Sequence, residues 1–160
     1  MTMLEPILTQ LEASHDGDPW YGSPRMRFIE HLTPSQAVAR PVEGAHSIWE
    51  TVLHLTSWTE EVLRRVDGGT PAAPASGDWP AVGAPTPAAW RAARAKLGKA
   101  HAALVARART LTPADAARPV GNGVTVAEML VGLAQHDAYH AGQIALLHRL
   151  VTATPPESTT

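Results

Sequence analysis

The chain has 160 residues, a net charge of −2 and no cysteine. This length suits one domain with a sizeable core, and the missing cysteines exclude disulfides, iron–sulfur clusters and thiolate metal sites. The weak charge, without a Lys/Arg block, argues against nucleic-acid binding, and no apolar run approaches the roughly 20 residues of a membrane span. We therefore expect a cytoplasmic protein that binds neither nucleic acid nor membrane, and any metal must be held by His, Asp or Glu.

Helix-start signals organise the chain. Ser47 to Glu50 and Thr125 to Glu128 have the form of a capping box, and each opens a long segment with helical periodicity. Thr33-Pro34 and Thr86-Pro87 place proline at a first helical position after an N-cap. The fold class is therefore predicted to be all-α, a bundle of four main helices with two short helical turns. The main helices are expected near 2–14, 47–66, 87–109 and 125–151, and the short turns near 24–32 and 113–117.

A long connection joins the second and third of these helices. The stretch from Asp67 to Pro85 is rich in Gly, Pro, Ala and Ser, and Trp79 is its only large side chain. Its length allows the chain to cross from one end of a bundle to the other. We expect a single helical domain over 1–151, followed by a flexible tail over 152–160.

Two histidines interrupt the apolar stripe of the last predicted helix. His136 and His140 are four residues apart, so on a helix their rings lie one above the other. They share a sector with Leu133 and Ile144 and therefore face the core. Buried imidazoles need partners for their nitrogens, and a shared divalent cation is one economical partner.

His54 is the candidate third ligand. It lies at the edge of the apolar stripe of the helix that begins at Ser47, and Trp58 and Glu61 share its face. Three imidazole ligands leave coordination positions open, as in reactive metal sites. The spacing alone also suits core or surface histidines. It does not suit the zinc-protease motif, in which a glutamate follows the first histidine.

Two segments carry a family resemblance. Residues 44–58 (GAHSIWETVLHLTSW) and 136–144 (HDAYHAGQI), with Pro19-Trp20-Tyr21-Gly22 upstream, resemble the hallmark regions of the DinB/YfiT-like superfamily. The resemblance covers most of the chain and implies a four-helix bundle that forms a homodimer. It also implies one divalent metal ion, commonly zinc or nickel, bound by His54, His136 and His140.

The resemblance implies an activity as well. Some relatives are metal-dependent enzymes that use low-molecular-weight thiols, which suggests a transferase acting on a small electrophile. An open divalent site can lower the pKa of a thiol and hold the thiolate as a nucleophile. The alternative is a non-catalytic, metal-stabilised bundle with a binding or stress-related role. No motif identifies a particular thiol, substrate or catalytic residue.

Several side chains near these motifs have two readings. Glu61 can transfer protons or bind the metal, but a solvated position is favoured; Asp137 is likewise expected on a solvated or interfacial face. Tyr139 can contact a substrate, but packing between helices is favoured. Gln143 can hydrogen-bond an imidazole or make a polar contact between helices or subunits.

The remaining aromatic side chains and histidines are given structural roles. At least two of four large rings are expected in the core, although all four can line a substrate cavity. The other histidines are expected at the surface or in local hydrogen bonds. The rings are Trp20, Tyr21, Trp49 and Trp58, and the histidines are His15, His31, His46, His101 and His148.

Overall fold

The described part of the chain is entirely helical. A computed structural model describes residues 4–153, and no strand occurs among them. The predicted all-α class is therefore confirmed, whereas positions 154–160 of the expected tail lie outside the described residues. The long helices are α1 (Glu5–His15), α4 (Ile48–Val66), α5 (Pro87–Ala108) and α7 (Val126–Thr152), and the short ones are α2 (Arg25–Ile29), α3 (Pro34–Val38) and α6 (Pro113–Ala117).

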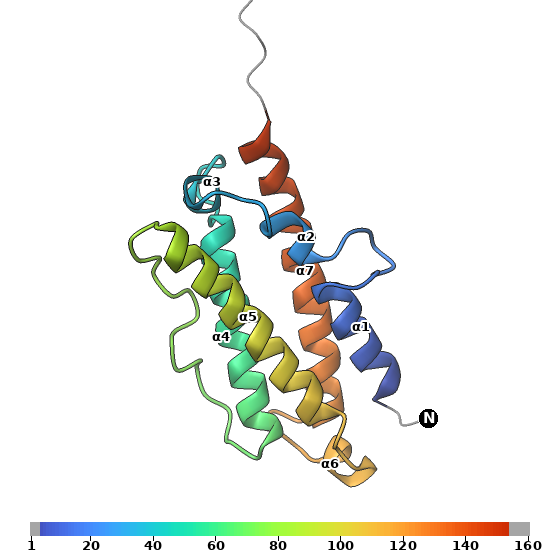
Figure 1. Ribbon diagram of the computed structural model, residues 1–160. Coiled ribbons are helices and arrows are strands. Elements are labelled where there is room, and N and C mark those ends of the chain that lie inside the picture. Colours follow the sequence, from blue (N-terminus) through green and yellow to red (C-terminus); the bar gives the residue numbers. More distant parts are fainter. Residues whose placement is uncertain (1–3, 154–160) are drawn as a thin grey trace, which may run out of the picture.

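The four long helices pack in a closed arrangement. α4 packs against α5 and α7, while α1 packs against α7 and α5 (Figure 1). α4 and α5 run in the same direction and α1 and α7 run in the opposite one. Because α4 and α5 are parallel, the connection between them returns along the outside of the bundle. The length of residues 67–85 allows such a path from one end of the bundle to the other.

Capping boxes begin four of the seven described helices, namely α3, α4, α6 and α7. Ser47 and Thr125 accept a hydrogen bond from the backbone N–H of Glu50 and Glu128, whose carboxylates accept from the cap backbone in return. Thr33 makes the same arrangement with Gln36 and begins α3. The prediction recognised the Thr33-Pro34 signal but assigned no helix there, because five residues are too few to show a helical period.

The apolar core consists of two clusters with polar side chains between them. One cluster includes Leu8, Leu104 and Leu130 near the end of the bundle where α7 begins. The other includes Leu55 and Ile144 near the opposite end. Between these levels, α1, α2, α4, α5 and α7 bury polar side chains, and this level is called the polar layer below. Its members are His15, Arg25, His54, His101, Asp137 and His140.

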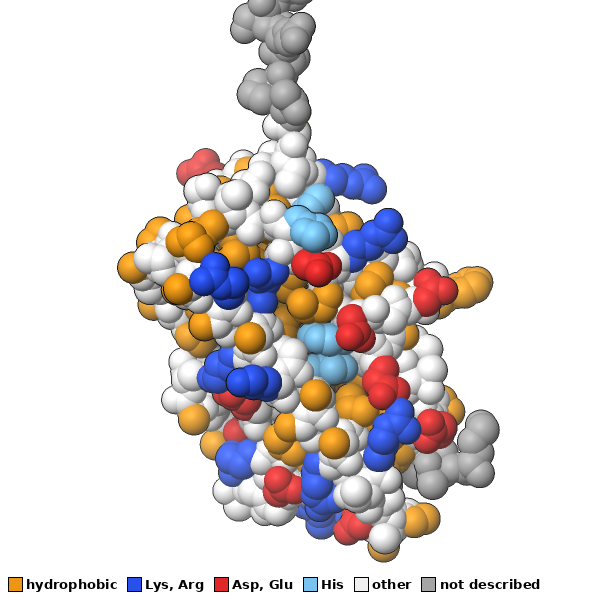
Figure 2. Space-filling view, viewed as in Figure 1, with side chains coloured by type: hydrophobic (Ala, Val, Ile, Leu, Met, Phe, Trp, Pro, Cys, Tyr) orange, Lys and Arg blue, Asp and Glu red, His pale blue; other side chains and the backbone are white. Residues whose placement is uncertain are grey.

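The outer surface carries charges of both signs. Figure 2 shows acidic and basic side chains mixed across one face, in keeping with the net charge of −2. No helix within residues 4–153 is long and apolar enough to cross a membrane.

Candidate metal centre

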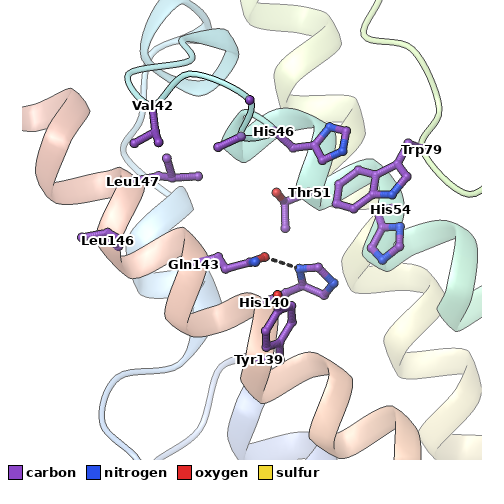
Figure 3. A pocket seen from close by; sticks show the side chains of 12 residues that line it. Val42, His46, Thr51, His54, Trp79, Tyr139, His140, Gln143, Leu146 and Leu147 are labelled. Atoms are coloured by element: carbon purple, nitrogen blue, oxygen red, sulfur yellow. Dashed lines mark hydrogen bonds between the residues drawn. The ribbon is translucent and has the colours of Figure 1, made fainter.

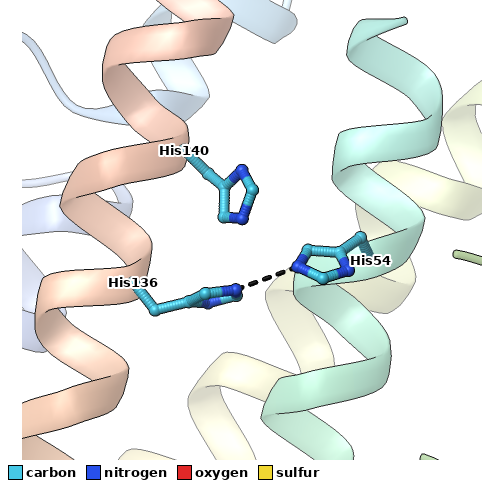
Figure 4. A group of neighbouring side chains, drawn as sticks. All are labelled: His54, His136 and His140. Carbon is cyan, nitrogen blue, oxygen red and sulfur yellow. Dashed lines mark hydrogen bonds between the residues drawn. The ribbon is translucent and has the colours of Figure 1, made fainter. Parts of the chain in front are cut away.

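The structure brings the three predicted histidines together. His54 projects from α4, and His136 and His140 project from successive turns of α7 toward it (Figure 4). One ring nitrogen from each histidine lies within 4.8 Å of the others, and Nε2 of His54 is 2.9 Å from Nε2 of His136. Two nitrogens bound to one tetrahedral zinc ion, at about 2.1 Å each, are roughly 3.4 Å apart, so a small movement of the rings would admit the ion. The separation therefore suits a shared cation.

Hydrogen bonds orient two of the rings. Nδ1 of His54 is 2.7 Å from the backbone oxygen of Asp78, and Nδ1 of His140 is 2.7 Å from Oε1 of Gln143. Both oxygens only accept, so each Nδ1 carries the proton and each Nε2 keeps its lone pair. Of the two readings left open for Gln143, the structure favours the hydrogen bond to an imidazole.

His136 is the ring without such support. Its Nδ1 is buried and has no hydrogen-bond partner among residues 4–153. A buried polar atom left in this state costs about 1–3 kcal/mol and calls for a functional explanation. Since Nε2 of His54 keeps its lone pair, the 2.9 Å contact is a hydrogen bond from Nε2–H of His136, and a bound cation would take the place of that proton.

The rings are held in the form that binds metals. Burial lowers the pKa of His140 to about 4, and neighbouring His136 lowers it further while the bond to Gln143 opposes the shift. Burial also lowers the pKa of His136. Both imidazoles are therefore neutral at pH 7, as a metal ligand must be.

The crossover connection completes one wall of the site. The indole of Trp79 stacks on the His54 ring with centroids 3.9 Å apart and on the His46 ring at 3.6 Å. Nε1 of Trp58 donates to Asp78 Oδ1 at 2.6 Å and so anchors the segment before Trp79. The sequence analysis assigned neither Asp78 nor Trp79 a role. The only signal was a single large ring within a connection of small residues.

Two cavities open onto the triad. The first, of about 580 Å³, is lined by His54 and His140 together with Trp79, Tyr139 and Leu147 (Figure 3). Another, also of about 580 Å³, is lined by His54 and His136 with Trp58 and Arg65. The cluster can therefore be approached from solvent. The expectation that Tyr139 packs between helices is wrong, because 65% of this residue is exposed at the first cavity.

Glu61 is a buried anchor and not a solvated helix residue. Only 3% of it is exposed, and its carboxylate accepts from both Arg64 and Arg65 and from the backbone N–H of Ala72. The hydrogen bond from Arg64, with help from Arg65 and Ala72, holds the pKa of Glu61 at about 2 in spite of burial. The prediction failed because the crossover connection covers this face of α4.

Asp137 also departs from its predicted position. It is 1% exposed and forms an ion pair at 2.5 Å with Arg25, which is completely buried. Helix spacing alone placed Asp137 on a solvated or interfacial face. The short helix α2, which packs against α7, covers that face instead.

The structural roles given to the other rings were partly wrong. Of the four large rings discussed above, Trp49 is buried in the core, but Trp20 is 97% and Tyr21 45% exposed. His15 and His101 are buried and stacked on each other, and both hydrogen-bond to Arg25, so of the two roles expected for them the hydrogen-bonding one applies and the surface one does not. Helix periodicity indicates neither that these two rings stack nor that the guanidinium of Arg25 contacts both of them.

In this all-α bundle three imidazoles converge beside an open cavity, an arrangement that can hold a metal ion. The chain belongs to the DinB superfamily, whose sequence model matches residues 26–144 and so includes all three histidines. This superfamily is metal-binding, and the three histidines of this chain can hold a metal ion. No curated protein and no solved structure matches the chain.

Proposed function

We propose that this protein is a metal-dependent transferase that joins a low-molecular-weight thiol to a small electrophile. His54, His136 and His140 would hold one divalent ion, zinc or nickel. The observation that carries the proposal is the convergence of three imidazoles, two of them buried and one half-buried, beside cavities open to solvent. A purely structural site has a closed coordination sphere, whereas a reactive one keeps a position for a substrate.

The protein's own residues have distinct tasks in this scheme. A divalent ion at an open site lowers the pKa of a thiol that binds to it and so supplies a nucleophile at neutral pH. Asp78 and Gln143 fix the directions of two imidazoles, and Trp79 shields the His54 ring from water. Tyr139 offers an O–H at the cavity for orienting the electrophile.

The transfer itself requires no redox partner. The thiol gives its proton to solvent, and its sulfur forms a bond to an electrophilic carbon. The leaving group departs with the electron pair of the bond that breaks. The lining of the first cavity is largely apolar and includes Val42, Leu146 and Leu147, and this favours an electrophile with an apolar body.

Metal analysis tests the first part of the proposal. Untagged protein should carry about one divalent ion per chain, whereas His54→Ala/His136→Ala/His140→Ala should carry almost none. His31→Ala is the matched control, because the His31 side chain is 88% exposed. Equal metal content in all three proteins would overturn the site.

Thiol binding tests the second part. Cobalt-loaded protein titrated with bacillithiol, mycothiol or glutathione should develop a sulfur-to-metal charge-transfer band with at least one of them. The same thiols are then assayed for transfer to a chromogenic aryl halide. Metal binding without any thiol band would favour the non-catalytic, metal-stabilised bundle. The homodimer implied by the family resemblance stays a prediction, which light scattering in solution would test.

A further inference from the structure

A second group of polar side chains occupies the polar layer on the side of α1 and α5. The guanidinium of Arg25 forms the ion pair with Asp137 and also contacts two histidines from different helices. Its Nε donates to Nδ1 of His15 at 3.2 Å, and its Nη2 lies 3.2 Å from Nδ1 of His101. One buried cation thus joins α1, α2, α5 and α7.

These contacts determine where the two imidazoles carry their protons. A guanidinium only donates hydrogen bonds, so both Nδ1 atoms must accept. Burial, reinforced by the charge of Arg25, lowers the pKa of His15 to about 3 and that of His101 to about 4. Both rings are neutral at pH 7, and each therefore carries its single proton on Nε2. Two protonated Nε2 atoms have no lone pair for a metal, which distinguishes this pair from the triad.

The two Nε2–H groups point the same way. The rings of His15 and His101 are stacked with centroids 4.3 Å apart and planes within 11° of each other. They are 7% and 6% exposed, and no residue within 4–153 accepts a hydrogen bond from either Nε2. Because both Nδ1 atoms face Arg25, the stacked rings present two parallel Nε2–H donors on the side away from the guanidinium.

A cavity of about 520 Å³ receives these donors. It is lined by both rings, by Gly98 and by charged side chains at its rim. A Cβ atom at Gly98 would lie 3.7 Å from Nε2 of His15, so the missing side chain leaves room beside that donor. Figure 2 shows histidine at the surface in the middle of this face, with acidic side chains beside it.

The charges at the rim narrow the choice of ligand. Glu12 is already bound by Arg109 at 2.6 Å, whereas Asp16 is exposed at the mouth of the cavity. Two parallel N–H donors match the two oxygens of a carboxylate. A carboxylate at the rim disfavours simple anions and favours a ligand that also carries a positive charge.

We propose that this cavity binds a small zwitterion of the amino-acid type, with its carboxylate on His15 and His101 and its ammonium group near Asp16. Neither the metal centre nor the proposed transfer reaction depends on this site, and its ligand reaches the protein from a different face. The buried ion pair with Asp137 holds the Arg25 guanidinium in place, and the guanidinium in turn orients the two imidazoles.

Imidazole-detected ¹H–¹⁵N NMR tests the proposal directly. The free protein should show His15 and His101 as Nε2–H tautomers at pH 7. L-Alanine should then shift both ring signals, while propionate, ethylamine and inorganic phosphate should bind less tightly. Because Asp16 is exposed, its ion pair should favour alanine over propionate by about fivefold. Failure of alanine to shift either ring, or equal shifts with phosphate, would overturn the proposal.

Two variants locate the binding site without altering the buried network. Gly98→Ala should weaken alanine binding by about tenfold, because its Cβ would contact Nε2 of His15 and occupy the space that the carboxylate needs beside that donor. Gly142→Ala is the matched control, since it makes the same change in a helix where a Cβ meets nothing within 4 Å. Asp16→Asn should remove the preference for alanine over propionate. Equal binding by the two glycine variants, or an unchanged preference in Asp16→Asn, would refute the assignment.

Discussion

The backbone oxygen of Asp78 lies 2.7 Å from Nδ1 of His54, although the two residues are 24 positions apart and Asp78 belongs to the irregular crossover. The crossover therefore does more than join two parallel helices. It fixes the tautomer of one candidate ligand, and through Trp79 it also covers the flat side of the same ring. Gln143 performs the corresponding task for His140 from within α7.

Removing the support of His140 should weaken metal binding without unfolding the bundle. Gln143→Ala deletes the acceptor for Nδ1–H, and loss of such an outer partner typically costs about 10–100-fold in metal affinity. Competition against a chromogenic zinc chelator measures the change. Gln135→Ala is the control, because Gln135 is exposed on the same helix and does not contact the triad. Equal affinities for the two variants would contradict this role for Gln143.

Trp79 should report on occupancy of the metal centre. Its indole stacks on His54, so a paramagnetic ion such as nickel bound to that ring should quench its fluorescence. Trp79→Phe should remove the largest share of the nickel-dependent quenching. Trp20→Phe should leave it unchanged, since Trp20 is 97% exposed. Similar quenching in both variants would place the ion elsewhere.

Glu61 should contribute strongly to stability. Glu61→Gln removes a buried carboxylate that accepts from Arg64, Arg65 and the backbone of Ala72, and the expected cost is about 2–3 kcal/mol of unfolding free energy. Urea unfolding measures this value. Its neighbour Glu60 is the control, because its contact with Lys96 is exposed and Glu60→Gln should cost at most about 1 kcal/mol. A smaller loss for Glu61→Gln than for Glu60→Gln would be inconsistent with the anchoring role.

The buried histidines should make the fold sensitive to mild acid. The folded-state pKa values of His15 and His101 are about 3 and about 4, below the reference value of 6.5. Between pH 6.5 and 4 the unfolded chain therefore binds more protons than the folded one, so stability falls as the pH is lowered. The full effect of one such histidine is about 1.4 kcal/mol per pH unit.

His101→Gln should reduce this slope. Glutamine keeps an acceptor for Arg25 but does not titrate. Between pH 6.5 and 5, the unfolding free energy of this variant should therefore fall less steeply than that of the parent protein, by up to about 1.4 kcal/mol per pH unit. The measurement is made on metal-free protein by urea unfolding. His31→Gln is the control, because the His31 side chain is 88% exposed and contacts none of the buried histidines. The interpretation fails if both variants keep the slope of the parent protein.

Helix periodicity predicted that His136 and His140 share an inward face and that His54 lies at the edge of an apolar stripe, whereas the set of three ligands came from the family resemblance. All three lie on long helices, where a residue's face follows from its position in the turn. The errors at Glu61 and Asp137 have one cause: each is covered by a segment without a long period, the crossover in one case and α2 in the other. The role of Trp79 was not predicted for the same reason, since a connection of small residues gives no indication of which helix it will cover.

The polar layer between the two apolar clusters also determines the register of the bundle. A slip of α7 by one turn relative to α4 would move it by about 5.4 Å. Such a slip would set His140 and the buried carboxylate of Asp137 against leucine side chains and would separate Arg25 from its only buried counter-charge among the described residues. Leucine layers alone tolerate a shifted alignment, but charges and imidazoles that must meet specific partners do not. The same side chains that make the chemistry available therefore allow only one alignment of the helices.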